Sequence, residues 1–236
     1  MCFHPEKCIV IRISNKRRPL QTLHEHRLEV VDREKYLGIT ISHDLQWANH
    51  ISNTIGKATR SLGFLRHNLG RCKPSVKANA YCTLIRPSLE YASSVWDPHQ
   101  TTLTKDLEQV QCRAARFVHN EYRDTSPGCV TTLLNNLGWE NLELRRMKHR
   151  LTLCYKIQNQ LVDINPVNHL TPGDSRTRGG HRYRQPRASG DVYKFSFYPR
   201  TVRDWNHLPE SVTAAPNLEE FRTLLDSLSW TLLQHP

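Results

Sequence analysis

The spacing of hydrophobic residues along the chain changes once, near Asn49. In residues 36–42 apolar and β-branched side chains form a short run that Gly38 interrupts, a pattern typical of a strand with a bulge or a close backbone approach. Ser42 and Asp44 follow with side chains suited to a turn. Beyond Asn49 the apolar residues recur at steps of three and four, the spacing of one helix face. The chain is therefore predicted to change from β to α structure at this junction.

The N-terminal part is predicted to form a small β element. Residues 3–14 contain alternating isoleucines, and residues 26–31 form a second run with two valines. With residues 36–42 these make three short strands, which bury too little apolar surface to be stable alone. We therefore expect the strands to pack against the helices, or against a part of a larger protein that this chain lacks.

Most of the remaining chain is predicted to be helical. Helices are expected over residues 49–69, 75–86, 101–119, 130–137 and 141–160, with a last helix from Pro216 onward. Pro87 is expected to interrupt or kink the second helix, because proline lacks an N–H donor and its ring clashes with the preceding turn. The alternating aromatic residues 192–198 favour a short extended segment. The predicted fold class is mainly α with a small N-terminal antiparallel β element.

Composition points to an anionic partner. The 236 residues carry a formal net charge of +11, and a basic surface attracts nucleic acid or anionic membrane. No apolar run approaches the roughly 20 residues of a membrane helix, so no membrane partner is predicted. The seven cysteines are scattered and odd in number, which fits reduced thiols in the nucleus or cytoplasm rather than a secreted protein.

The sequence contains no recognisable active site. His24 and His26 have no cysteine or histidine partner at zinc-site spacing, so no metal site is predicted. The chain also lacks a nucleophile motif, a glycine-rich phosphate loop and an adjacent pair of aspartates that could hold two metal ions. No catalytic residue and no cofactor are therefore assigned to this chain.

Clusters of basic residues are the strongest candidates for binding nucleic acid. Residues 165–190 are rich in proline, glycine and arginine without apolar periodicity, which predicts a long exposed basic loop. Guanidinium groups match phosphate geometry, although a solvated loop without a ligand is the alternative. Two predicted helices add cations that are either phosphate contacts or an ordinary solvated face. The candidate contacts are Lys57, Arg60, Arg66, Arg145, Arg146, Arg176, Arg178, Arg182, Arg184 and Arg187.

Several short motifs occur in a specific order along nearly the whole chain. They are His4-Pro5-Glu6-Lys7-Cys8, Lys35-Tyr36-Leu37-Gly38, Asp44-Leu45-Gln46-Trp47, Leu62-Gly63-Phe64-Leu65-Arg66, Arg86-Pro87-Ser88-Leu89-Glu90-Tyr91-Ala92-Ser93, Val95-Trp96-Asp97-Pro98, Gln111-Cys112-Arg113-Ala114-Ala115-Arg116-Phe117, Leu137-Gly138-Trp139, Phe197-Tyr198-Pro199-Arg200-Thr201 and Trp205-Asn206-His207-Leu208-Pro209. Each is weak alone. In this order and spacing the chain resembles the C-terminal part of the reverse transcriptases of non-LTR retrotransposons, of the jockey-like and chicken-repeat type.

The resemblance implies a role for each part of the chain. Residues 1–48 resemble the edge of the polymerase palm, in which Lys7 matches the palm-motif lysine and Tyr36, Leu37 and Gly38 match the primer-grip turn. The rest is expected to comprise thumb-like helices, a helical C-terminal region, the basic loop, and an aromatic segment with the final helix, over residues 49–98, 99–164, 165–190 and 191–236. The implied partners are RNA or DNA and the missing fingers and palm of the parent polymerase.

The resemblance also implies what this chain lacks. In the family the catalytic aspartates precede the motif that matches residues 4–8, so this chain is expected to be a fragment without polymerase activity, and Mg²⁺ is expected only in a full-length parent. The alternatives are a helical protein-interaction module without nucleic-acid function and a piece of a longer active enzyme. Salt-dependent binding of RNA separates the first alternative from the main hypothesis, because phosphate contacts release counterions.

Overall fold

The structure is a computed structural model that describes residues 4, 8–13, 22–23, 26–173 and 182–228. Lys7, His24, Arg176 and Arg178, which the sequence singled out, lie outside the described residues. The described chain is mainly helical with short strands near its N-terminus, so the predicted fold class is confirmed.

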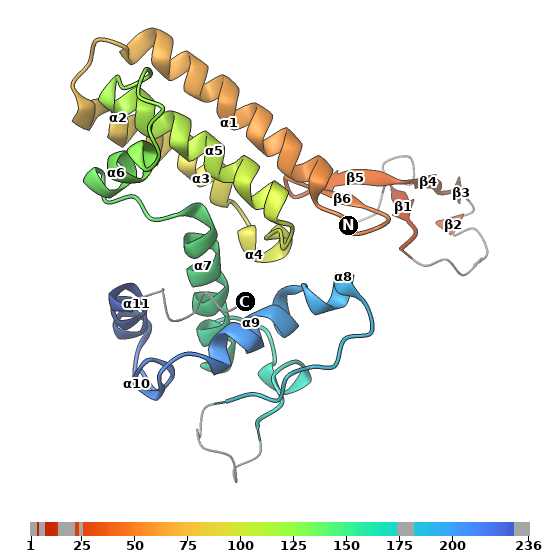
Figure 1. Ribbon diagram of the computed structural model, residues 1–236. Coiled ribbons are helices and arrows are strands. Elements are labelled where there is room, and N and C mark those ends of the chain that lie inside the picture. Colours follow the sequence, from red (N-terminus) through yellow and green to blue (C-terminus); the bar gives the residue numbers. More distant parts are fainter. Residues whose placement is uncertain (1–3, 5–7, 14–21, 24–25, 174–181, 229–236) are drawn as a thin grey trace.

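Six short strands form the β element at one end of helix α1 (Figure 1). They are β1 (Ile9–Ile11), β2 (Thr22–Leu23), β3 (His26–Arg27), β4 (Glu29–Val31), β5 (Arg33–Tyr36) and β6 (Ile39–Ser42). The β2–β3 and β5–β6 pairs are antiparallel as predicted, whereas β1 and β4 pair in parallel. In the described part of the chain, each of the three β-sheets contains two strands. Such small sheets bury little apolar surface, so the β element is expected to need packing against α1 to be stable.

The predicted single strand over residues 36–42 is instead the turn and second strand of a hairpin. Tyr36 of β5 pairs with Ile39 of β6, so only Leu37 and Gly38 connect the two strands. Both connecting residues have positive φ, 47° and 86°, which is the backbone of the two-residue turn that suits a right-handed hairpin twist. Gly38 therefore reverses the chain and does not form a bulge within one strand.

The first group of helices follows the predicted pattern closely. It comprises α1 (Ala48–Leu69), α2 (Pro74–Ala80), the π-helical turn η2 (Tyr81–Ile85), α3 (Arg86–Glu90), α4 (Ser93–Trp96), α5 (Thr101–His119) and α6 (Cys129–Asn136). The bounds of α5 are those expected from its apolar stripe. Pro87 interrupts the second predicted helix, as expected from its missing N–H donor. The chain continues through a π turn, in which the Arg86 N–H bonds the carbonyl of Tyr81.

The second group contains one wrong prediction. It comprises α7 (Leu142–Gln158), the 3₁₀ turn η3 (Pro166–Asn168), α8 (Asp191–Lys194), α9 (Phe197–Asn206), α10 (Glu210–Thr213) and α11 (Leu218–Ser227). The aromatic residues 192–198, predicted to be extended, belong mainly to α8 and the start of α9. Asn217 begins α11 by accepting the Glu220 N–H at 2.8 Å, the bond that a helix N-cap supplies.

Two hydrophobic cores use different parts of α7. The first contains buried residues from Ile39 to Leu142 and is formed by β6, α1–α6 and the start of α7. The second contains buried residues from Leu151 to Leu225 and is formed by the rest of α7 with α9–α11. Figure 1 shows α7 running from the first helical group into the second. The cores therefore divide within α7.

A buried cluster of charged residues joins the two cores. Asp97, just after α4, forms ion pairs with Arg146 and Arg150 of α7 and with Arg200 of α9, at 2.6 Å for Arg146 and 3.3 Å for Arg200. Arg200 also donates to the main-chain oxygen of Asp97 at 2.9 Å. Asp204 accepts a second bond from Arg150 at 2.6 Å. One carboxylate thus connects three elements that lie far apart in the sequence.

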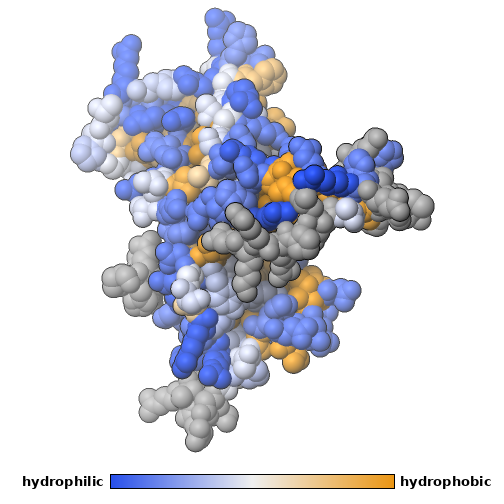
Figure 2. Space-filling model, turned by 90° about the vertical axis from the view of Figure 1, so that its right-hand side faces the viewer, coloured by the Kyte–Doolittle hydropathy of each residue, from blue (hydrophilic) through white to orange (hydrophobic). Residues whose placement is uncertain are grey.

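Other side chains confirm the predicted distribution of apolar residues. Trp96, Trp139 and Trp205 are buried in the two cores. The six cysteines in the described residues are all free thiols. Figure 2 shows one face of the molecule, on which separate hydrophobic patches interrupt a largely hydrophilic surface. Among the described residues, no helix combines the length and the apolar character needed to cross a membrane.

Replacing Asp97 with asparagine is expected to destabilise the fold strongly. Asp97→Asn leaves three arginines without their shared carboxylate, and breaking a buried ion pair costs about 3 to 5 kcal/mol. Urea unfolding of both proteins measures this difference in the free energy of unfolding. Asp163→Asn is the matched control, because Asp163 is exposed. A stability change for Asp97→Asn as small as that of the control would contradict this assignment.

Candidate nucleic-acid interface

A groove of about 1050 Å³ runs between the β5–β6 hairpin, the first half of α1 and the η2–α3 segment. The hairpin leads directly into α1, so the junction recognised in the sequence forms one wall of this groove. Its lining residues are Lys35, Leu37, Gly38, Thr40, His50, Ser52, Asn53, Thr54, Gly56, Lys57, Arg60, Leu84, Pro87, Ser88 and Tyr91.

The hairpin turn is fixed at one end of the groove by Tyr91. The Tyr91 hydroxyl donates to the main-chain oxygen of Leu37 at 3.1 Å. A Cβ atom at Gly38 would lie 3.3 Å from Tyr91 Cε1, in addition to requiring a positive φ. Only glycine meets both requirements easily. The Tyr36-Leu37-Gly38 segment therefore forms a defined turn against the helical group, as its sequence predicted.

His50, in the first turn of α1, connects this helix to the hairpin. The Thr40 N–H donates to His50 Nδ1 at 3.3 Å, and the imidazole meets the ring of Trp96 edge-on at 5.2 Å between centroids. Because Nδ1 accepts, the neutral ring carries its proton on Nε2. Burial, assisted by the positive charge of Lys35, lowers the pKa of His50. An uncharged His50 therefore links the hairpin to α1 beside the groove.

The charge of the groove is of one sign. Lys35, Lys57 and Arg60 line it, and Lys57 and Arg60 are exposed on the same face of α1. Neither aspartate nor glutamate is present among the described residues that line it. A concave surface with cations and no carboxylate concentrates a positive potential and attracts an anionic chain.

Exposed apolar and aromatic side chains accompany these cations. Leu37, Leu84 and Tyr91 are 73%, 62% and 58% exposed. Leu84 belongs to the π-helical turn, which displaces the helix face before Pro87, and such turns occur often at functional sites. A tyrosine ring with one free face can stack on a nucleic-acid base, so the groove offers contacts for both phosphates and bases.

Two predicted contact residues, Arg66 and Arg145, do not line the groove. Arg66, near the end of α1, lies over the ring of Tyr122 at 4.9 Å from the centroid and does not line the groove. Arg145 forms a bidentate ion pair with Glu90, with Nη2 and Oε2 3.1 Å apart. The Glu90 carboxylate raises the pKa of Arg145, as expected for a satisfied charge pair.

The prediction for Arg146 is wrong. Its side chain is fully buried against Asp97, so it cannot reach a phosphate on the surface. Burial lowers the pKa of Arg146, because desolvation disfavours its charged form. The basic run of α7 was interpreted as a possible binding face, whereas Arg146, Lys148 and Arg150 point into the protein and form internal ion pairs.

The described end of the basic loop is anchored rather than loosely exposed. Tyr183 inserts into the second core, where its hydroxyl donates to Gln158 at 2.8 Å. Asn206 of α9 bonds both the N–H and the carbonyl of Tyr183, at 2.9 and 2.7 Å. Arg182, Arg184 and Arg187 remain exposed. These three cations are therefore exposed, as predicted for this loop, and the segment that carries them is anchored at Tyr183.

The described residues hold no recognisable metal site, and comparison with known proteins identifies no family. Within the described residues, no group of three or more histidine, cysteine, aspartate or glutamate side chains could hold a metal ion. Compared with models of protein families, with curated proteins and with solved structures, the chain shows no match. The geometry of the groove is therefore the principal structural guide to function.

Sequence reasoning missed several residues of this groove. Lys35, His50 and Leu84 were not assigned to a site, because their shared location depends on the hairpin folding back onto α1 and η2. A signal for His50 was present, since it lies one residue before Ile51 on the buried side of the predicted helix. A polar residue beside a buried position often has a specific hydrogen-bond partner.

The stability of the protein is expected to fall below about pH 6.5, partly because of His50. Burial lowers the pKa of His50 below its ordinary 6.5, so the unfolded chain binds the proton first as the pH falls, and the folded state is disfavoured. Urea unfolding at about pH 7.5 and 5.5 should show a smaller loss of stability in His50→Asn than in the wild type, because asparagine does not titrate. His99 and His149 remain in both proteins. An equal loss in the two proteins would contradict the role of His50.

Proposed function

We propose that this chain is the thumb-containing C-terminal part of a non-LTR retrotransposon reverse transcriptase, and that it binds RNA or DNA through the groove between the β5–β6 hairpin and α1. The observation that carries the proposal is a cationic groove without a carboxylate, ending at an exposed aromatic turn. The ordered motifs of the sequence support the family, and one of them, Tyr36-Leu37-Gly38, coincides with the end of the groove.

The cationic and aromatic residues of the groove are expected to make different contacts with nucleic acid. Lys57 and Arg60 are spaced three residues apart on α1, so their charges follow one helix face and can contact neighbouring phosphates. Tyr91 supplies a ring beside them and also fixes the turn through Leu37. Binding of this kind depends on charge and stacking, and it is therefore expected to tolerate many base sequences.

A protein-interaction module is the competing function. The exposed Leu37, Leu84 and Tyr91 would also suit an apolar partner surface. That function does not require the groove cations, whereas contacts with phosphate do. Removing the cations while keeping the apolar side chains therefore distinguishes the two functions.

Replacing both α1 cations is expected to weaken RNA binding. In Lys57→Ala/Arg60→Ala two phosphate contacts are lost, so the plot of log affinity against log salt should flatten by about 0.7 for each contact with a single strand. Fluorescence anisotropy with a labelled RNA of about 20 nucleotides, at salt concentrations from about 50 to 200 mM, measures both quantities. Lys105→Ala/Arg113→Ala removes the same charge from exposed positions on α5 and is the matched control.

The alternatives give different results in the same assay. If the groove and control variants bind RNA equally well, the groove is not the contact surface. Testing Arg182→Ala/Arg184→Ala/Arg187→Ala in parallel then shows whether the anchored basic segment makes the main contact. A wild-type chain that binds no RNA at low salt would favour the protein-interaction module.

The chain alone is expected not to extend a primer. Its sequence contains no adjacent pair of aspartates, and two-metal nucleotidyl transfer requires carboxylate ligands. Primer extension on a poly(rA) template with Mg²⁺ measures this activity, with a buffer blank as the reference. Template-dependent incorporation above the blank would contradict the expectation without affecting the prediction of RNA binding.

A further inference from the structure

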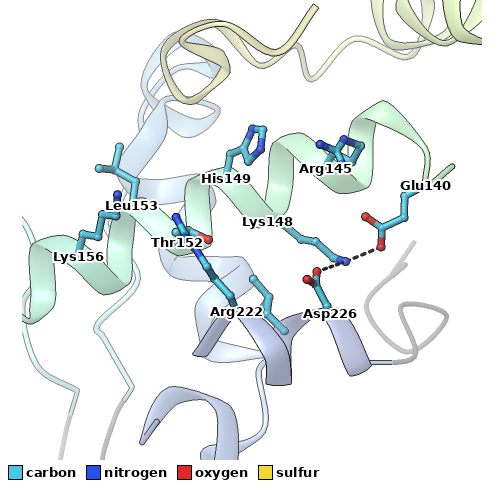
Figure 3. A pocket seen from close by; sticks show the side chains of 10 residues that line it. Glu140, Arg145, Lys148, His149, Thr152, Leu153, Lys156, Arg222 and Asp226 are labelled. Atoms are coloured by element: carbon cyan, nitrogen blue, oxygen red, sulfur yellow. Dashed lines mark hydrogen bonds and ion pairs between the residues drawn. The ribbon is translucent and has the colours of Figure 1, made fainter. Parts of the chain in front are cut away.

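A second cavity lies between α7 and α11 and shares no lining residue with the groove. Its volume is about 410 Å³, within the size range of pockets that hold small ligands. Figure 3 shows side chains of α7 and α11 facing one another across it, with Glu140 at one end. The cavity is therefore a separate feature of the second helical group.

The cationic side chains that line this cavity differ in whether they form ion pairs. Arg145 pairs with Glu90, outside the cavity, and Lys148 contacts both Glu140 and Asp226. Lys156 of α7 and Arg222 of α11 form no ion pair with any residue in the described part of the chain. Two cations without a counter-charge therefore line the same cavity from opposite helices.

The local charge balance favours an anion. Four cationic side chains and two carboxylates line the cavity, and Glu90 outside it neutralises Arg145, which leaves a surplus of one positive charge. His149 adds no full charge near neutral pH, because desolvation lowers its pKa. Both carboxylates contact Lys148, so the unbalanced charge lies toward Lys156 and Arg222. Such an arrangement is unfavourable unless solvent or an anionic ligand compensates it.

The donors present in this part of the cavity match the oxygens of a phosphate group. The Arg222 guanidinium can donate two parallel hydrogen bonds and Lys156 supplies a compact charge, as in many phosphate sites. Thr152 of α7 lines the same cavity and adds a hydroxyl group (Figure 3). Leu153 and Leu225 provide an apolar wall suited to the organic part of a ligand. These side chains resemble a binding site more than a random charged surface.

We propose that the cavity between α7 and α11 binds a phosphate group through Lys156, Arg222 and Thr152. The proposal goes beyond nucleic-acid binding in the groove and does not depend on it. The phosphate belongs either to a small phosphorylated compound or to a phosphodiester of RNA, and the same side chains would recognise both. AMP, inorganic phosphate and single-stranded RNA are therefore the three probes.

Isothermal titration of the full chain with each probe tests the site. Arg222→Gln is expected to weaken phosphate binding about tenfold, the effect of losing one charge-assisted contact. Arg113→Gln is the matched control, because Arg113 is also an exposed arginine within a long helix. Asp226→Asn should strengthen binding, since it removes a negative charge from the cavity and a contact of Lys148. Lys156→Gln provides a second test from the other helix.

The pattern of losses identifies the source of the phosphate. Weaker binding of AMP and inorganic phosphate in Arg222→Gln supports a small phosphorylated ligand, and weaker binding of RNA alone supports a phosphodiester. Wild-type affinity of Arg222→Gln and Lys156→Gln for all three probes, or no binding of any probe by the wild type, would overturn the proposal. Lys57→Ala/Arg60→Ala changes the groove and Arg222→Gln changes this cavity, so failure at the groove and failure at this cavity are distinguishable.

Discussion

The arrangement of the two helical groups depends on the ion pairs of Asp97. This carboxylate follows α4 in the first group, yet its arginine partners lie on α7 and α9. The apolar contacts of each core stabilise the group to which they belong, but they do not determine the angle between the groups. The ion pairs of three guanidinium groups with this carboxylate restrict that angle, because all three groups must lie close to the same two oxygen atoms.

Burying these charges has a free-energy cost that the cluster only partly offsets. Burial lowers the pKa values of Arg146 and Arg200 and lowers that of Arg150 to about 10, which shows how strongly desolvation opposes the charged forms. Both terminal nitrogens of Arg146 are buried without a hydrogen-bond partner in the described chain. An apolar contact of the same size could give more stability. We attribute the cluster to specificity, since its ion pairs join residues of α7 and α9 to Asp97 in this one arrangement.

The sequence predicts local structure well here and long-range pairing poorly. The stripe of Leu107, Val110 and Ala114 locates α5, because helix periodicity is a property of neighbouring residues. The aromatic residues 192–198 look extended, but Phe195 stacks on His99 at 3.9 Å between centroids, so tertiary packing decides their conformation. Arg146 looks exposed because its partner Asp97 is 49 residues away. For the same reason the groove was only partly predicted, from its turn and its α1 cations.

The sequence separations in the Asp97 cluster also set an order of assembly during synthesis. The first core uses residues up to Leu142, so all of its parts have been translated before α9 exists. Arg200 follows Asp97 by 103 residues, a delay of roughly 5 to 20 seconds at ordinary translation rates. Arg146 follows Asp97 by 49 residues, so α7 can pair with the carboxylate in the second half of this interval, and α9 is added to a junction that is already charged and partly formed.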